Sequence, residues 1–333
     1  MNLVRRQLAV LAGSLTMWPS VGFAQPARKI ARVYVLLPTR ADEVTRRVVA
    51  AFKGRLAELG WREGSNIEYA VRYAEGNAAN YKTLAAEAVA GKPDLVFVSF
   101  GPFAAVVKKH TADIPIVFMI SQDPVAQGLV ASLARPGGNA TGVSTRSREL
   151  VGKRLQLIKE ALPSMSKIGV VRPVGLPTSG NSMPLVEELK GATARLGLKL
   201  VEARHEHSKA GAFGPAFAQL VGQGVDAVAT VLNWNYSYYP EFVQHAIQAR
   251  LPTICDATEF VDAGGLMSFS ASYVERWIKS ADYVNRILRG AKPADLPVEE
   301  PTVFDLTVNL KTARALGLTI PQSILLRADR VIK

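Results

Sequence analysis

The stretch Ile114–Gly142, IPIVFMISQDPVAQGLVASLARPGGNATG, carries the pattern that decides the fold of this chain. Its first part, PIVFMI, is apolar without alternation, which is typical of a parallel strand covered on both faces. Polar residues follow at once, and Pro124 favours the first turn of a helix. We therefore read the stretch as a buried strand, a polar turn, a helix and a crossover. This is the layout of a binding loop in an open α/β sheet.

The same strand and helix pattern occurs in two series along the 333 residues. Apolar strand-like runs, each followed by a helical pattern, begin at Ala31, Asn66, Leu95 and Pro115 in the first series and at Lys167, Leu198, Ala227 and Leu251 in the second. Short βα turns and right-handed crossovers then place each half in a doubly wound parallel sheet. The length and the 48% hydrophobic content suffice for two cores.

Four long blocks, in order, resemble the substrate-binding proteins of bacterial ABC transporters. They are the DPV of Asp123–Val125, the GLVASLARPGGNATG of Gly128–Gly142, the EFVDAGGLMSF of Glu259–Phe269 and the segment Ala294–Leu318. The resemblance runs from the first residues to the last and implies the type I periplasmic binding fold, which has two similar lobes and three crossings. Characterised relatives include binders of aromatic amino acids.

We therefore expect an α/β protein with two doubly wound parallel-sheet lobes joined by three crossover segments. The first lobe is predicted to contain residues 29–143 plus 266–303, including a helix over Tyr273–Leu288, and the second to contain 144–265 plus 304–333. The expected crossings are GNATGVSTRS, GGLMSFS and PTVFDLTVNL.

Residues 1–24 have the three-part layout of a secretory signal peptide. Arg5 and Arg6 precede an apolar run over Leu8–Trp18, which is too short to span a bilayer, and we expect cleavage after Ala24. The arginine pair also fits the twin-arginine export route, so the route stays open. No later segment has 18 continuous apolar residues. We therefore expect a soluble periplasmic protein.

Neither the charge nor the single cysteine points to a further class of protein. The formal net charge is +12, and loss of a leader with two arginines and no acid leaves +10. The basic residues are scattered, without a nucleic-acid-binding motif, so solvated helix faces explain them and no nucleic acid partner is expected. Cys255 lies in the apolar run LPTIC and is best read as a small buried hydrophobe.

Ligands of doubly wound lobes bind where strands end, so the polar residues just after strands are the candidate site. In the predicted first lobe these are Thr39, Arg40, Ser99, Gly101, Pro102, Ser121 and Asp123. In the second they are Arg172, Asn181, Asn233, Trp234, Tyr236, Asp256 and Glu259.

Three of these predictions compete with structural roles. Gly101 and Pro102 open a helix whose first amides suit an anion, but Ser99 also suits the cap of that helix. Asp123 suits an ammonium or hydroxyl group of the ligand, and the alternative is that it caps the helix predicted after Pro124.

The remaining candidates indicate the ligand class. A guanidinium at Arg172 favours an anionic ligand, unless it points to solvent. Trp234 and Tyr236 with their asparagines suit stacking of a flat or cyclic ligand, although a core-facing helix start is the alternative. Asp256 and Glu259 either bind a polar group or are solvated turn residues.

Other chemistry is not supported by the sequence. His205 and His207 have a spacing that suits one face of a metal site but lack further ligands, so we expect no metal. There is no phosphate-binding loop, dinucleotide fingerprint or nucleophile elbow, so we expect no cofactor and no catalysis.

The sequence thus predicts a monomeric solute-binding protein, not an enzyme. It would capture a small molecule, for which we expect an aromatic amino acid or aromatic carboxylate, and deliver it to an ABC permease in the inner membrane. The alternative is a sensory module that presents its ligand to a membrane receptor. A cytoplasmic repressor of related fold would need a DNA-binding headpiece where the leader stands.

Overall fold

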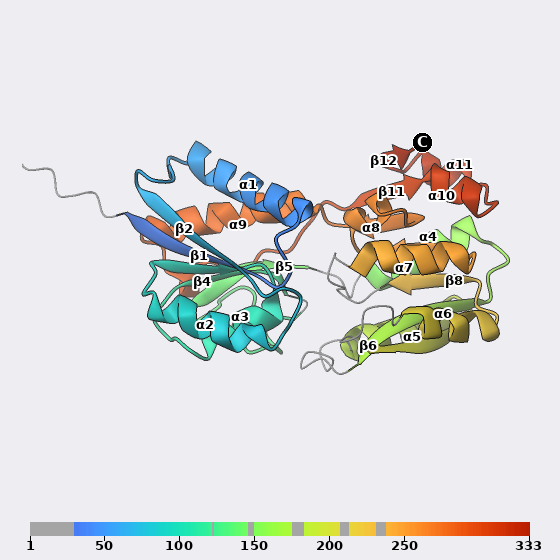
Figure 1. Ribbon diagram of the computed structural model, residues 1–333, viewed down its shortest axis with the longest axis horizontal. Coiled ribbons are helices and arrows are strands. Elements are labelled where there is room, and N and C mark those ends of the chain that lie inside the picture. Colours follow the sequence, from blue (N-terminus) through green and yellow to red (C-terminus); the bar gives the residue numbers. More distant parts are fainter. Residues whose placement is uncertain (1–29, 122, 146–149, 175–182, 207–212, 231–237) are drawn as a thin grey trace, which may run out of the picture.

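Two sheets with helices on both faces form two lobes that lie side by side in the computed structural model (Figure 1). The structure describes residues 30–333 except 122, 146–149, 175–182, 207–212 and 231–237. The order of the first sheet is β2-β1-β3-β4-β5 and that of the second is β12-β11-β10-β9-β8-β6-β7. No helix in the described ranges is long and apolar enough to cross a membrane.

The first lobe is built around five parallel strands. These are β1 (Ala31–Leu37), β2 (Ile67–Tyr73), β3 (Leu95–Val98), β4 (Ile116–Ser121) and β5 (Ala140–Ser144). The helices α1 (Glu43–Glu58) and α9 (Tyr273–Leu288) cover one face, and α2 (Asn80–Ala90) and α3 (Gly101–Lys108) cover the other.

Alternation along β1 explains this three-layer arrangement. Val33 and Val35 belong to the core under α1 and α9, whereas Tyr34 and Leu36 belong to the core under α2 and α3. Successive side chains of a strand point to opposite faces, so an apolar run without alternation requires helices on both sides.

The second lobe contains the larger sheet. Its strands are β6 (Lys167–Val174), β7 (Lys199–Glu206), β8 (Ala227–Thr230), β9 (Thr253–Cys255), β10 (Met267–Ser270), β11 (Asp305–Asn309) and β12 (Arg330–Ile332). Its helices are α4 (Leu150–Ala161), α5 (Met183–Arg195), α6 (Phe213–Gly222), α7 (Tyr239–Gln248), α8 (Thr258–Asp262), α10 (Leu310–Ala315) and α11 (Gln322–Leu325). A short 3-10 helix, η3 (Pro293–Asp295), follows α9.

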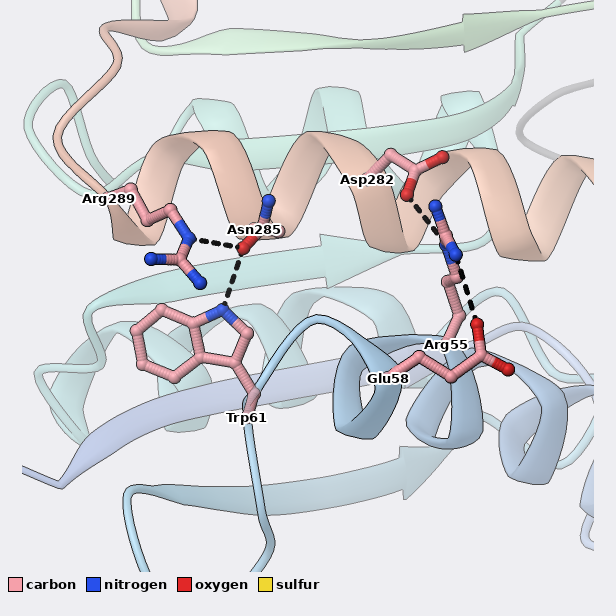
Figure 2. Close-up of polar contacts among 6 residues, drawn as sticks. All are labelled: Arg55, Glu58, Trp61, Asp282, Asn285 and Arg289. Atoms are coloured by element: carbon pink, nitrogen blue, oxygen red, sulfur yellow. Dashed lines mark hydrogen bonds and ion pairs between the residues drawn. The ribbon is translucent and has the colours of Figure 1, made fainter.

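The helix α9 belongs to the first lobe although it comes late in the chain. Trp61, which follows α1, donates its Nε1–H to Asn285 Oδ1 on α9 at 3.0 Å, and Arg289 Nε donates to the same oxygen at 2.8 Å (Figure 2). Trp277 of α9 is fully buried against Phe97 and Phe52. The chain therefore returns from the second lobe to complete the core of the first.

Two details differ from the predicted organisation. The predicted boundary at residue 266 assigns Met267–Ser270 to the first lobe, whereas β10 pairs with β9 and β11 and lies in the second sheet. β11 runs antiparallel to β10, which makes the second sheet mixed and not wholly parallel.

The helix predicted after Pro124 was wrong. Residues 124–128 form turns, with Gly128 at a φ of +68°. Pro124 favoured a helix start, but Gly128 adopts the left-handed conformation that a helix interior excludes. Leu129 and Val130 are instead buried in the core under α2 and α3.

Candidate functional site

The candidate ligand-binding residues of the first lobe follow the carboxyl ends of three adjacent strands. β1, β3 and β4 are neighbouring parallel strands, so the residues that follow them, including Thr39 and Ser99, come to one edge of the sheet. Thr39 is 3% exposed, and its hydroxyl has no hydrogen-bond partner among the described residues. Arg40 is exposed, and its carbonyl accepts a hydrogen bond from Thr45 Oγ1 at 2.9 Å.

The side chain of Ser99 does not cap α3, in contrast to the alternative that the sequence left open. Phe100 is the N-cap residue of α3 and has an extended backbone, while Ser99 donates its N–H to the carbonyl of Leu36 at 3.0 Å. Gly101 is buried and Pro102 half-buried at the first turn. The use of these first amides by an anion stays a prediction.

Asp123 caps a turn in this structure. Its Oδ1 accepts the N–H of Ala126 at 2.9 Å, and its carbonyl accepts that of Gln127 at 3.0 Å. The capping role that competed with ligand binding is thus present, but around turns instead of a helix. Contact of Asp123 with a ligand stays a prediction.

Arg172 lies within β6 and not after it, because the strand continues to Val174. Its Nε lies 3.5 Å from Glu202 Oε2 on β7, and Glu202 is also 3.8 Å from Lys190 Nζ on α5. The guanidinium is therefore involved in an ion pair within the second lobe. Its contact with a ligand stays a prediction.

Asp256 and Glu259 follow β9 in the second lobe. Asp256 Oδ1 lies 3.6 Å from the thiol of Cys255, which is buried as predicted. Glu259 lies on α8, and its Oε2 is buried without a hydrogen-bond partner among the described residues. Burial raises the pKa of Glu259, against the lowering effect of its own backbone N–H and of the positive charge of Arg276.

Two buried arginines near these acids were missed by the sequence analysis. Arg154 on α4 is 1% exposed, and its Nε donates to the carbonyl of Phe269 on β10 at 2.8 Å. Burial lowers the pKa of Arg154, while the negative charge of Asp256 raises it. Arg276 on α9 is 9% exposed. An arginine on an otherwise apolar helix face, such as Arg154 between Val151 and Leu155, is the signal that reveals such a group.

A pocket of about 570 Å³ lies between the lobes. Val44, Arg47 and Val48 of α1 line it from the first lobe, and Tyr239 and Glu259 line it from the second. The start of α9 and the residues Asp305 and Arg330 complete the wall. Arg330 pairs with Asp262 at 2.6 Å. The pocket therefore combines apolar walls with charges from both lobes.

Several predicted residues lie outside what the structure describes. They are Asn181, Asn233, Trp234 and Tyr236, together with the side chain of Ser121. His207 also lies outside, while His205 is buried and stacks on Phe213 with ring centroids 4.0 Å apart. Within the described ranges no group of three or more metal-binding side chains occurs.

Comparison with known proteins identifies relatives along almost the whole chain. Residues 34–332 match the family described as ABC transporter substrate binding protein. A tyrosine-binding protein of Clostridioides difficile (strain R20291) is 27% identical over 263 residues, which cover 79% of this chain and 74% of that protein.

Two solved structures are similar over both lobes. A conserved domain protein from Vibrio cholerae has a TM-score of 0.82 and 32% identity, and covers 91% of this chain and 100% of its own. The structure of the ABC domain in complex with L-Trp from Streptococcus pneumonia has a TM-score of 0.79 and 27% identity, with the same coverage.

Proposed function

This chain belongs to the ABC transporter substrate-binding proteins, and from that premise we propose that it captures an aromatic amino acid or aromatic carboxylate between its lobes. It then delivers this ligand to an ABC permease in the membrane. The observation that carries the choice of ligand is that two relatives spanning both lobes, each 27% identical, are a tyrosine-binding protein and a protein in complex with L-Trp.

The features of the inter-lobe region support a zwitterionic ligand with a flat apolar part. The pocket between the lobes has apolar and aromatic walls from Val44, Val48 and Tyr239. Arg47 of the first lobe and the charged residues Glu259, Asp262, Asp305 and Arg330 of the second line it, and such charges suit the ammonium and carboxylate of an amino acid. The apolar walls suit an aromatic ring.

Binding would act by a shift of population between open and closed lobes. The open form exchanges ligand freely, and a ligand that contacts both lobes favours the closed form by its extra contacts there. The permease then recognises the closed arrangement. We expect the mature chain to act in this way as a monomer in the periplasm, after removal of residues 1–24.

Thermal shift and calorimetry on the mature chain test the ligand class. A ligand that binds only the folded protein raises its melting temperature, so L-tyrosine, L-tryptophan and L-phenylalanine should each be compared with glucose, ribose and aliphatic amino acids. Stabilisation by a sugar with no effect of any aromatic compound would overturn the proposal. If an aromatic ligand binds but deletion of the gene leaves its uptake unchanged, the sensory role replaces transport.

A further inference from the structure

Arg276 is a buried cation whose hydrogen-bonding capacity is not used. It is 9% exposed, and its Nε is buried with no hydrogen-bond partner in the described part of the chain. A guanidinium has five N–H donors, and a buried donor without an acceptor costs free energy. Such a group in a binding protein points to an acceptor that arrives with the ligand.

The side chain of Arg276 points toward the start of its own helix. Long side chains on helices lean toward the N-terminus. Accordingly, the guanidinium carbon of Arg276 lies 5.5 Å from the centre of the Tyr273 ring, one turn earlier. The guanidinium therefore lies beside the first turn of α9.

The first turn of α9 itself favours an anion. α9 has 16 residues, and the first amides of a helix have no partner within the helix. Ser272 caps it by accepting the N–H of Glu275 at 3.3 Å, which uses one of these amides. The helix dipole adds a partial positive charge at this end, so an oxyanion placed here meets both the helix terminus and Arg276.

Charged neighbours do not satisfy Arg276. Glu259 on α8 attracts it and Arg154 on α4 repels it, but neither forms a hydrogen bond with it in this structure. Lys279, one turn later, pairs with Glu299 Oε2 at 2.6 Å. Glu275 is exposed at the rim and is the one adjacent charge on α9 that opposes an anion.

A small hollow adjoins this group. It has a volume of about 160 Å³ and is lined by Ser272, Glu275, Arg276, Lys279 and the chain around Thr302. Ser272 also lines the 570 Å³ pocket between the lobes. The small hollow has room for a carboxylate, and Ser272, which lines both, places the larger pocket next to it.

We propose that Arg276 and the first turn of α9 form the subsite for the carboxylate of the transported ligand. The subsite rests on the proposed function for its ligand, and assigns the carboxylate end to the first lobe beside the hinge. The guanidinium presents two parallel N–H groups to the carboxylate, which gives orientation as well as affinity.

Ligand pairs that differ only in the carboxylate test this subsite. Calorimetry should compare L-tryptophan with tryptamine, and L-tyrosine with tyramine, on the wild type and on Arg276→Gln. We expect R276Q to bind the amino acids at least tenfold more weakly, while binding of the amines changes less than twofold. Arg276→Lys keeps the positive charge but lacks the planar guanidinium, so its affinity for the amino acids should lie between that of the wild type and that of R276Q. Arg286→Gln, on the same helix but lining neither the small hollow nor the larger pocket and paired with Glu299, is the matched control and should bind like the wild type.

Equal losses for amino acid and amine in R276Q would overturn the subsite and indicate that Arg276 instead pairs with Glu259 on closure. An unchanged affinity for the amino acids would also overturn it. Ligand-free melting of R276Q and R276K establishes that both variants are folded.

A second experiment tests the carboxylate subsite independently of the proposed ligand class. Melting of the wild type and R276Q is compared in acetate, benzoate, phosphate and chloride at equal ionic strength. If neither the aromatic amino acids nor benzoate binds but acetate stabilises only the wild type, the ligand class falls and the carboxylate subsite stands. If phosphate alone stabilises the wild type, the site takes a free oxyanion and the assignment to a ligand carboxylate is overturned. If no anion and no amino acid distinguishes the two proteins, there is no subsite.

Discussion

Arg55 on α1 and Asp282 on α9 form an ion pair with Nε and Oδ1 2.8 Å apart, although 227 positions separate them in the sequence (Figure 2). Arg55 also lies 3.0 Å from Glu58, and these two carboxylates raise its pKa through hydrogen bonds. The pair joins the first helix of the chain to the helix that returns from the second lobe. The pair is one of several contacts, with the buried Trp277 and the Trp61–Asn285 hydrogen bond, that keep α9 and with it Arg276 in the first lobe.

Replacement of Asn285 by Ala should destabilise the first lobe. Asn285 Oδ1 accepts from both Trp61 and Arg289, so the change removes one hydrogen bond between α9 and the segment after α1 and one within the end of α9. With about 0.5–1.5 kcal/mol for each hydrogen bond, we expect a loss of about 1–3 kcal/mol in the free energy of unfolding, measured in urea. Asp282→Asn, at an exposed ion pair, should cost less. The reverse order would show that the exposed pair, and not Asn285, holds α9.

Gly142, near the end of β5 where the chain leaves the first lobe, should tolerate no side chain. Gly142 in β5 has a φ of +156°, and a Cβ there would lie 1.9 Å from the carbonyl oxygen of Phe118. Gly142→Ala should therefore lower the free energy of unfolding by at least about 2 kcal/mol, because the backbone of β4 must shift. Gly152→Ala is the control, since that glycine lies within α4 with nothing within 4 Å, and should stabilise by about 0.5–1 kcal/mol. Equal stability of the two variants would contradict this account.

The strands and the long helices could be predicted because the spacing of their apolar residues matches the faces that they bury in the cores. The predicted strand at Ala31 and the helix over Tyr273–Leu288 coincide with β1 and α9. The segment after Pro124 could not be predicted in the same way. Its buried Leu129 and Val130 imitate a helix face, whereas the left-handed Gly128 decides its backbone.

The candidate site was predicted in part, through the rule that ligands bind at strand ends. That rule selects Thr39 and Glu259, but it does not select Arg276, which lies in the first turn of a helix. The burial of Arg276 depends on how α9 packs after the chain has crossed between the lobes twice. Such long-range packing leaves no local pattern in the sequence beyond a charged residue on an apolar helix face.

The stability contributed by Glu259 should fall as the pH rises. Burial raises its pKa above the value of about 4.3 in the unfolded chain, although the charges of Arg276 and Arg47 act in the opposite direction and that of Asp262 in the same direction. Between the two pKa values the folded protein holds more protons than the unfolded one, so the free energy of unfolding decreases with increasing pH. Glu259→Gln removes this dependence. The stability of the variant relative to the wild type should therefore increase from about pH 4 upward.

Urea unfolding over this pH range measures the effect, and Glu160→Gln provides a control of opposite sign. Hydrogen bonds from Ser323 and Arg327 lower the pKa of Glu160, so its contribution is present above the unfolded pKa and is lost as the pH falls. Glu160→Gln should therefore be less stable than the wild type at neutral pH and approach it in acid. A difference between Glu259→Gln and the wild type that is constant with pH would contradict the prediction.

Asp123→Asn separates the two roles of this side chain. The asparagine keeps an oxygen that can accept the N–H of Ala126, so the turn should remain capped and the melting temperature should stay near that of the wild type. The carboxylate charge is lost, so an aromatic amino acid should bind at least tenfold more weakly, as expected for a charge-assisted hydrogen bond of about 1.5–3 kcal/mol. An aromatic acid without the amino group should bind with unchanged affinity, because it has no ammonium to interact with the carboxylate.

Asp123→Ala, which also removes the cap, should add a loss of stability to the same change in affinity. Calorimetry with both ligands decides the matter: equal weakening of the two by Asp123→Asn would exclude Asp123 from recognition of the ammonium and leave it as a turn cap.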